Sequence, residues 1–226
     1  MDQPDFLIRT RDGYDRTAAD YAERFHHHLD DKPVELAVLS AFAGLINKGP
    51  NRQVVDVGCG TGATTDLLHS HGVDPVGIDL SPGMIAEARR LNPALAFRVG
   101  SMTSLDTADD SVGGVCAWYS IIHIPDSHLG DVFSEFRRVL TPGGLVLLAF
   151  QVGDEPLVLT EAFGHDVHLT YARRRPQDIR KMLADNGFDV YAEVVRQPDD
   201  NDVESTPQAF VIARKRPPHS PRETSS

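Results

Sequence analysis

Three glycines at alternating positions follow a β-branched run in the stretch VVDVGCGTG, which spans residues 54–62. A turn of this kind exposes backbone N–H groups at the start of a helix and suits an anionic part of a ligand. A dinucleotide-binding turn has the spacing G-x-G-x-x-G and must hold a pyrophosphate. Here Asp56 stands two places before Gly58, and a carboxylate at that position suits an amino group or a sulfonium. The turn therefore indicates an amino-acid-like portion of a ligand.

A second carboxylate follows at Asp79, where the next predicted strand ends. In α/β proteins, an acidic residue about 20 positions beyond the glycine turn accepts hydrogen bonds from ribose hydroxyls. Asp79 lies at about that separation from Gly58. The two features together predict a nucleoside-like ligand.

Strand-like apolar runs alternate with helical patterns around these residues. The spacing predicts strands over 53–57, 75–79, 96–99, 113–118 and 145–150, and helices over 64–70, 82–91 and 127–140. It also predicts a helix over 176–186, two last strands over 188–195 and 208–213, and an inserted strand within GHDVHLTY, residues 164–171. This alternation predicts a parallel sheet with helices on both faces.

The length of 226 residues suits one α/β domain with an added lobe. We expect a single domain over 1–216, with a helical N-terminal lobe or lid at 1–50, a cofactor-binding core at 51–150 and an acceptor-pocket insert at 151–175. Residues 217–226 have no apolar side to bury and are predicted to be a disordered tail.

Composition argues against two classes of partner. The chain carries 22 basic and 33 acidic residues, a formal net charge of -11, which repels nucleic acid over most of the surface. No apolar run approaches the roughly 20 residues that cross a bilayer, so no membrane span is expected. The N-terminus lacks a secretory signal, and Cys59 and Cys116 are expected to be unpaired, both of which favour the cytoplasm. For the assembly we expect a monomer or a homodimer.

Three motifs occur in order: VVDVGCGTG, then VGIDLSPGMIAEAR, then EFRRVLTPGGLVLLAF. Together they resemble the class I methyltransferases that depend on S-adenosylmethionine (SAM), and the resemblance covers roughly residues 14–150. It implies an α/β, Rossmann-like fold whose seven-stranded sheet is mostly parallel, with the last strand antiparallel. It also implies SAM as cofactor, S-adenosylhomocysteine (SAH) as product and a small-molecule acceptor.

The resemblance assigns parts of the cofactor to individual positions. The glycines back the methionine moiety, Asp56 holds its amino group directly or through water, Asp79 takes the ribose hydroxyls, and Leu80 lies against adenine. Tyr14 and Tyr21 lie on a helix that closes over the cofactor. The expected cofactor-binding residues are Tyr14, Tyr21, Asp56, Gly58, Cys59, Gly60, Gly62, Asp79, Leu80, Met84, Gly100, Ser101, Met102, Tyr119 and Ser120.

An acceptor hydroxyl or protonated amine must lose a proton during methyl transfer, and histidine is the natural base near neutral pH. His123 follows the fourth predicted strand, whereas His165 and His168 lie after the fifth, in a segment expected to line the acceptor pocket. Each of the three can instead be a surface or capping histidine.

Two charged runs have simpler interpretations. The histidines at 26–28 are adjacent on a predicted helix, so they diverge and cannot share one ion; solvated helix surface is expected and no metal site. The arginines at 173–175 either meet an acidic acceptor or form a solvated loop.

Three functions remain in competition. The first is a SAM-dependent methyltransferase that acts by in-line displacement on O, N or C of a small molecule. The second is a protein that binds SAM without transferring its methyl group, or one repurposed for another reaction. The third is an NAD-dependent oxidoreductase, which needs the G-x-G-x-x-G spacing and a closely spaced tyrosine and lysine; neither occurs in the chain.

Overall fold

The computed structural model describes residues 4–199 and 204–217. Two helices come first, α1 (Asp5–Phe25) and α2 (Pro33–Asn47), as the N-terminal pattern predicts. The alternating region follows, with β1 (Gln53–Val57), α3 (Ala63–Ser70), β2 (Asp74–Asp79), α4 (Pro82–Leu91), β3 (Ala96–Val99), β4 (Val112–Trp118), the 3-10 helix η1 (Ile121–His123), α5 (Asp126–Val139) and β5 (Leu140–Gln151). The last elements are β6 (Leu157–Ala162), β7 (His165–Tyr171), α6 (Pro176–Asp185), β8 (Phe188–Arg196) and β9 (Gln208–Lys215).

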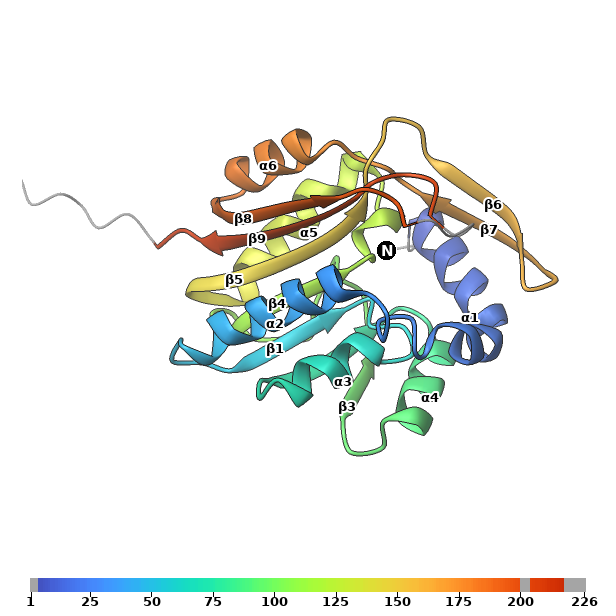
Figure 1. The fold of residues 1–226 in the computed structure, drawn as a ribbon, viewed down its shortest axis with the longest axis horizontal. Helices are drawn as coiled ribbons and strands as arrows, with labels where there is room; N and C mark the ends of the chain where they lie inside the picture. Colours follow the sequence, from blue (N-terminus) through green and yellow to red (C-terminus); the bar gives the residue numbers. More distant parts are fainter. Residues whose placement is uncertain (1–3, 200–203, 218–226) are drawn as a thin grey trace, which may run out of the picture.

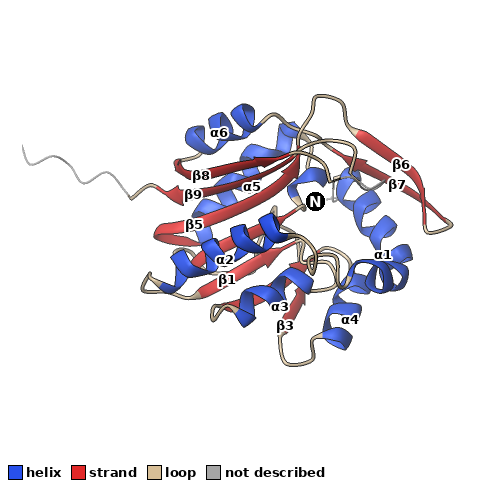
Figure 2. Ribbon diagram, viewed as in Figure 1, coloured by secondary structure: helices blue, strands red, loops and turns tan. Residues whose placement is uncertain are grey.

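Seven of these strands form one sheet in the order β3-β2-β1-β4-β5-β9-β8 (Figures 1 and 2). The pairs from β3 to β5 are parallel, whereas β9 runs antiparallel to both β5 and β8. The structure therefore confirms the expected α/β fold, with a mostly parallel sheet whose last strand is antiparallel.

The sheet is buried because its two faces are covered by different helices. On β4, Val115 and Ala117 pack on the side of α5 and α6, while Cys116 and Trp118 pack on the side of α2 and α3. This period of two is what a strand requires, and burial on both faces explains why β4 reads as a continuous apolar run. Both predicted unpaired cysteines, Cys59 and Cys116, are buried and free.

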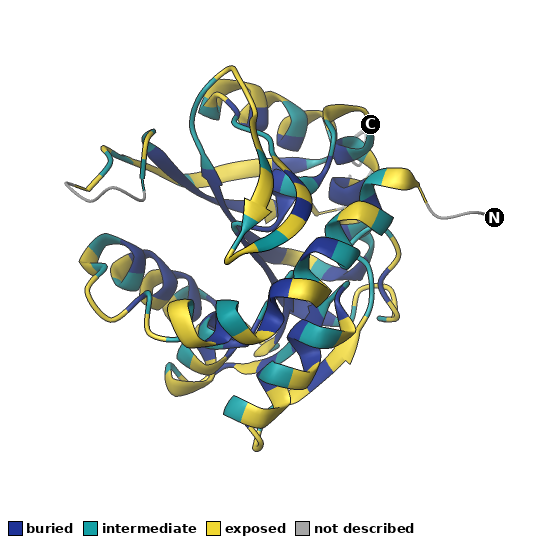
Figure 3. Ribbon diagram, turned by 90° about the vertical axis from the view of Figure 1, so that its right-hand side faces the viewer, coloured by how far each residue is buried: buried dark blue, intermediate teal, exposed yellow. Residues whose placement is uncertain are grey.

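The carboxyl ends of the parallel strands point toward α1 and toward the hairpin formed by β6 and β7 (Figure 1). The hairpin is a separate two-stranded sheet. The sequence predicts only one strand here, over residues 164–171, so β6 is an addition. Its side chains are half or fully exposed (Figure 3), and such a strand lacks the alternation that marks a half-buried one.

The hairpin packs on α1 through the inner side of β7. Val167 and Leu169 are buried, and a Cβ placed on Gly13 of α1 would lie 2.8 Å from Cδ2 of Leu169. The absence of a side chain at Gly13 thus lets α1 approach the hairpin closely.

The predicted disordered tail begins at residue 217, and 218–226 lie outside the described residues. In the part that the structure describes, no helix is long and apolar enough to cross a membrane.

Candidate functional site

The glycine turn connects β1 to α3 with a backbone that other residues rarely adopt. Gly58 and Gly60 have φ angles of 70° and 54°. A Cβ on Gly58 would lie 2.3 Å from Cβ of Ser120, which no real contact tolerates, whereas a Cβ on Gly60 would meet only Cε1 of Tyr21, at 3.9 Å. Gly58 is therefore required for packing against the end of β4, and Gly60 keeps open the space beneath α1.

The N–H groups of this turn are occupied within the fold. Gly58 and Cys59 both donate to the carbonyl of Ile78, and Gly60 donates to the Asp79 carboxylate at 2.9 Å. The donors left for a ligand are those of the first turn of α3, because Gly62 at its N-cap has no side chain to bond them. The turn thus contributes its open shape, and α3 contributes the N–H groups.

Asp79 is held at the carboxyl end of β2 by two backbone donors. Its carboxylate accepts from Gly60 and from Ser81, each at 2.9 Å. Burial raises the pKa of Asp79, while these N–H groups lower it, and the net pKa is raised. The acid is fixed in position with further lone pairs available to a ligand.

Asp56 lies beneath the turn and does not reach a cavity surface. It is fully buried, its Oδ2 accepts from the Thr65 hydroxyl at 2.6 Å, and its Oδ1 has no partner among the described residues. Burial raises the pKa of Asp56 to about 7. Asp56 was expected to hold the amino group of the methionine moiety either directly or through water. Its burial away from the cavity does not match direct contact, so contact through water is the role that still fits.

A hydrogen-bonded chain joins α1, η1 and β7. The Tyr14 hydroxyl lies 2.8 Å from Nε2 of His123, and Nδ1 of His123 lies 3.0 Å from the Thr170 carbonyl. A carbonyl only accepts, so Nδ1 carries the proton and Nε2 accepts from Tyr14. Burial lowers the pKa of His123 to about 4. Burial and the neighbouring Tyr171 raise the pKa of Tyr14, so both members of this pair are neutral near pH 7.

A first cavity lies between α1 and the carboxyl ends of β1 and β4. The expected cofactor residues on its wall are Tyr14, Tyr21, Gly58, Cys59, Gly60, Met84, Tyr119 and Ser120, together with the predicted base His123. The Ser120 hydroxyl oxygen is buried there without a partner in the described structure. Tyr119 has a φ of 51°, a strained value for a side chain of its size.

A second cavity adjoins the first. The two share six residues: Tyr14, Tyr21, Phe25, His28, Trp118 and Tyr119. The additional lining of the second cavity includes aliphatic residues of the turn between α1 and α2, of η1 and of β6, and polar residues near the ends of β5 and β9. Two adjoining cavities with an aromatic boundary suit two ligands that meet.

Other expected cofactor residues gather beside the first cavity without lining it. These are Asp79, Leu80, Gly100, Ser101 and Met102 at the carboxyl ends of β2 and β3, and Gly62 at the start of α3. The backbone N–H of Gly100 donates to the Asp79 carbonyl, and the Ser101 hydroxyl is 2.8 Å from that of Thr103. The hydrogen bond from Gly60 to the Asp79 carboxylate links this group to the wall of the first cavity.

The structure does not bring His165 or His168 to either cavity. On β7, the alternation that buries Val167 and Leu169 turns His168 outward, beside the start of α1. Nε2 of His165 instead pairs with Asp20 of α1 at 3.0 Å, with both side chains close to half exposed.

The interpretation of residues 26–28 as solvated helix surface is wrong for His28. Helix α1 ends at Phe25, and the following turn brings His28 to the wall of both cavities, where burial lowers its pKa. Its Nδ1 is 2.6 Å from the Phe25 carbonyl. His28 was missed because residues 26–28 were expected to belong to a helix, whereas they form the turn after it. Within the described ranges, no cluster of His, Cys, Asp and Glu could hold a metal ion.

Thr61, Ala63 and Thr64 also line the first cavity, although the sequence analysis does not single them out. Their position could have indicated this role, because they lie where the glycine turn ends and α3 begins, and a helix N-terminus suits an anionic ligand group.

Helix α1 is tied to the cofactor side of the site through Asp15. Its Oδ1 accepts from the Ser81 hydroxyl at 2.5 Å and from the N–H of Gly83 at 2.8 Å, at the start of α4. Ser81 in turn accepts from the N–H of Met84, as an N-cap does. The helix that carries Tyr14 and Tyr21 is therefore docked on the element that follows Asp79.

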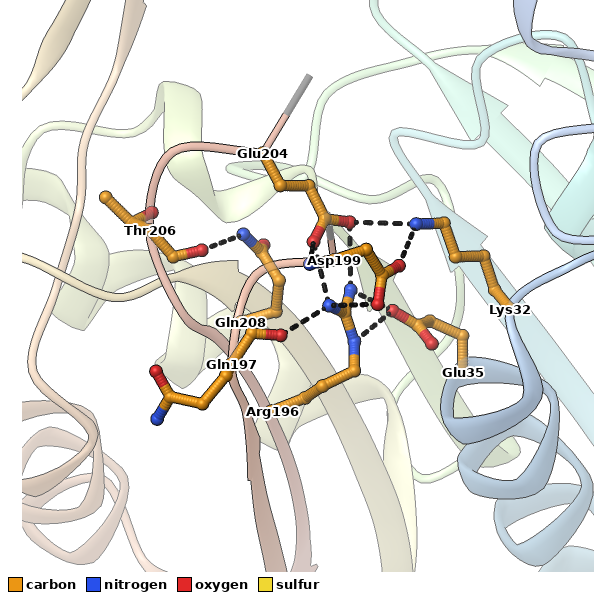
Figure 4. A network of polar contacts seen from close by, with 8 residues as sticks. All are labelled: Lys32, Glu35, Arg196, Gln197, Asp199, Glu204, Thr206 and Gln208. Atoms are coloured by element: carbon orange, nitrogen blue, oxygen red, sulfur yellow. Dashed lines mark hydrogen bonds and ion pairs between the residues drawn. The ribbon is translucent and has the colours of Figure 1, made fainter. Parts of the chain in front are cut away.

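A charged network includes three residues of the wall of the second cavity, Lys32, Glu35 and Glu204 (Figure 4). Arg196 of β8 bonds Glu35 of α2 at 2.5 Å and Glu204 at 2.8 Å, and Lys32 contacts both Glu204 and Asp199. Hydrogen bonds from Arg196 outweigh the burial of Glu204 and lower its pKa to about 2. The network joins the N-terminal helices to the last two strands.

Comparison with known proteins identifies the central part of this architecture. A family model described as "Methyltransferase domain" matches residues 54–144, the segment that holds the glycine turn and Asp79. Residues 54–144 are therefore similar to a methyltransferase domain. The chain is 38% identical over 100 residues to a demethylmenaquinone methyltransferase of Beutenbergia cavernae, which is 44% of this chain and 41% of that protein. It is 29% identical over 169 residues to an O-methyltransferase of Pyrenophora dematioidea, which is 70% of this chain and 62% of that protein.

Solved methyltransferase structures share the fold of this chain. The magnesium protoporphyrin IX methyltransferase of Synechocystis PCC 6803, solved with bound SAM, has a TM-score of 0.69 at 18% identity and covers 95% of this chain and 99% of its own. A SAM-dependent methyltransferase from Methanosarcina mazei has a TM-score of 0.66 at 18% identity, over 74% of this chain and 93% of its own. Both curated relatives above are matched over less than two thirds of their own length.

Proposed function

We propose that this chain is a SAM-dependent methyltransferase that transfers a methyl group to O, N or C of a small molecule and releases SAH. The observation that carries the proposal is the contact between Gly60 and the Asp79 carboxylate at the edge of the first cavity. It places an open glycine turn next to a fixed carboxylate, which is the arrangement expected for the methionine and ribose ends of one ligand.

The residues present fit such a cofactor. The first-turn amides of α3, beside Thr61, Ala63 and Thr64, suit the carboxylate of the methionine moiety. The unpartnered Ser120 hydroxyl lies on the same wall. The NAD alternative lacks support, since the turn does not have the G-x-G-x-x-G spacing that a dinucleotide pyrophosphate requires.

When bound, SAM supplies a sulfonium methyl group that a nucleophile displaces in line. The protein then has to bring the acceptor atom to about 3 to 3.5 Å from that methyl carbon and exclude water. We assign this to the aromatic boundary between the cavities, formed by Tyr14, Trp118 and Tyr119 among others. The strained backbone of Tyr119 suits a residue fixed for such positioning.

We assign proton removal to His123 acting through Tyr14. The Tyr14 oxygen can accept a proton from an acceptor hydroxyl while it donates its own to Nε2 of His123. With a pKa of about 4, His123 is a weak base, so it would act as the C–O or C–N bond forms rather than before. The placement of His165 and His168 outside both cavities leaves them without this role.

We further propose that residues 1–216 act as one domain, in which α1 and α2 close over the cofactor and the hairpin of the 151–175 segment completes the acceptor pocket. This is supported by the contacts of Asp15 with α4 and of Gly13 with β7. The net charge of -11 and relatives named as O-methyltransferase support a small-molecule acceptor.

Calorimetry with SAM, SAH and NAD, followed by a turnover assay with SAM and a panel of small hydroxyl and amine compounds, tests the proposal. We expect SAM and SAH to bind, NAD not to bind, and SAH to accumulate. Binding of NAD alone would overturn the proposal. Binding of SAM without turnover of any acceptor would favour a non-catalytic SAM-binding protein.

A further inference from the structure

One charged side chain on the wall of the second cavity has only neutral partners. Arg173 donates to the Ser205 hydroxyl at 2.8 Å and lies 3.5 Å from Oε1 of Gln151. Among the described residues it has no carboxylate within ion-pair distance, whereas Lys32, Glu35 and Glu204, which share the cavity wall, are all paired with opposite charges. A half-buried guanidinium with neutral partners can still bind an anion.

Arg173 is held in place by its neighbours. The backbone of Ala172 donates to Ile122 at 2.7 Å and that of Arg174 donates to Gln151 at 3.0 Å, so the residue between them is fixed at both sides. The guanidinium of Arg174 is buried and bonds the carbonyls of Ile121 and Ile124. A cation on a fixed backbone loses less entropy when it binds a ligand than one on a mobile loop.

The three adjacent arginines therefore have three different environments. Arg174 is a buried structural residue, and Arg175 is exposed and pairs with Asp154 at 2.5 Å. Only Arg173 of the three lines the second cavity, and it does not line the first.

The rest of the second cavity is mainly aromatic and aliphatic near the boundary with the first. Trp118 stacks on Phe210 at 5.3 Å between ring centroids and stands edge-on to Tyr119 at 5.6 Å. Such walls favour a planar, apolar body of a ligand. The cavity thus offers an aromatic end next to the first cavity and a cationic group away from it.

We propose that the methyl acceptor is an aromatic molecule bearing a carboxylate, which Arg173 binds, so that a different atom of the acceptor faces the cofactor. This rests on the proposed function. Because Arg173 lines only the second cavity, the carboxylate serves as an anchor and is not the methylated group. The fork of the guanidinium matches the two oxygens of a carboxylate.

The charge around the cavity favours a carboxylate over a phosphate. The network of Figure 4 brings Lys32 and Arg196 together with Glu35, Asp199 and Glu204, so carboxylates exceed cations there. A dianion would be repelled more strongly than a monoanion beside this excess.

Fluorescence of Trp118 provides a direct test, because it is the only tryptophan of the chain and lines the cavity. Hydroxybenzoates and hydroxycinnamates, each paired with its primary amide, are titrated into protein saturated with SAH. We expect at least one acid to bind at least tenfold more tightly than its amide. We expect Arg173→Gln to remove that preference, Arg173→Lys to retain part of it, and the matched control Arg175→Gln to keep it. Calorimetry should give the same SAH affinity in all four proteins.

The outcomes separate this inference from the proposed function. Equal binding of every acid and its amide, or no binding of any acid by a protein that still binds SAH, would overturn the inference and leave the methyltransferase proposal intact. A methyl ester as the reaction product would also overturn it, because the carboxylate would then be the acceptor. Failure of SAH to bind the wild-type protein would instead contradict the proposed function itself.

Discussion

The hydroxyl of Tyr14 donates a hydrogen bond to Nε2 of His123 across 2.8 Å, although 109 positions separate the two residues in the chain. The contact joins α1 to η1 on the wall of the first cavity, and Tyr14 also lines the second. It makes α1 part of the proposed proton path as well as a cover for the cofactor.

Substitution of this pair should affect turnover more than cofactor binding. We expect kcat to fall about a hundredfold in both Tyr14→Phe and His123→Ala, because the first substitution breaks the proton path and the second removes the proton acceptor. Steady-state kinetics and SAH calorimetry check this, with the exposed Tyr191→Phe as control. Since the pKa of His123 is lowered to about 4, its protonation should reduce kcat only below about pH 5. A decrease of kcat between pH 7 and 6 that disappears in His123→Ala would contradict the assignment.

Removal of the Asp79 carboxylate should weaken cofactor binding. We expect Asp79→Ala to lower the affinity for SAM and SAH at least tenfold, because charge-assisted hydrogen bonds to a ligand are each worth about 1.5 to 3 kcal/mol. Calorimetry measures the effect. Asp74→Ala, at the exposed start of the same strand, is the matched control. An unchanged affinity in Asp79→Ala would mean that the ribose lies elsewhere.

A single methyl group on the glycine turn should disrupt the site. Gly58→Ala places a Cβ 2.3 Å from Cβ of Ser120, and we expect loss of SAH binding and a lower Tm. Because the clash involves the side chain of Ser120, the double variant Gly58→Ala/Ser120→Gly should recover part of the stability. Gly130→Ala, where no atom lies within 4 Å, should leave SAH binding unchanged. Equal effects of the substitutions at positions 58 and 130 would refute the packing argument.

The network of Figure 4 should show strong coupling between its members. Arg196→Gln leaves Glu35, whose side chain is only 4% exposed, without its cation, and we expect a loss of about 3 kcal/mol in the free energy of unfolding. Glu35→Gln in addition should restore much of it, as urea unfolding of the single and double variants can measure. Additive losses would show that the two residues do not interact.

Asp56 should make stability depend on pH in an unusual direction. In the folded protein its pKa is raised to about 7, whereas an unfolded aspartate ionises near 3.8, so between these values the folded state holds a proton that the unfolded chain has lost. Wild-type stability relative to Asp56→Asn should therefore fall as pH rises from about 4 to 7, by on the order of a few kcal/mol, and change little above that. Urea unfolding at several pH values checks this, with the exposed Asp131→Asn as control. A difference that grows with pH would contradict the raised pKa.

Local signals allowed much of the fold to be predicted. The bounds of β1, β3 and α4 agree with the predicted ranges, because β-branched runs, Ser81 and Pro82 mark where those elements begin. Gly187, which directly follows the helix predicted over 176–186, has a φ of 82° and so ends it. The strand β6 could not be predicted, since LVLTEA is exposed on both sides and its pairing with β7 depends on the hairpin.

The site was less predictable where it depends on tertiary contacts. The glycine turn and Asp79 are close in sequence and carry their own pattern. His28, Arg173 and Gln208 reach the second cavity from three distant segments, and nothing in their local sequence indicates that these segments meet. The alternation on β7 also removes His168 from the pocket, a consequence of a register that depends on packing against α1.

Helix α1 forms a wall of both cavities and is attached on each side, through Asp15 to α4 and through Tyr14 to η1. A ligand in one cavity that stabilises this docked position of α1 therefore also stabilises the wall of the other cavity. By thermodynamic reciprocity, if bound SAM raises the affinity for the methyl acceptor by some factor, the bound acceptor raises the affinity for SAM by the same factor. We therefore expect the two substrates to bind with positive cooperativity, and SAH to dissociate faster once the methylated product has left.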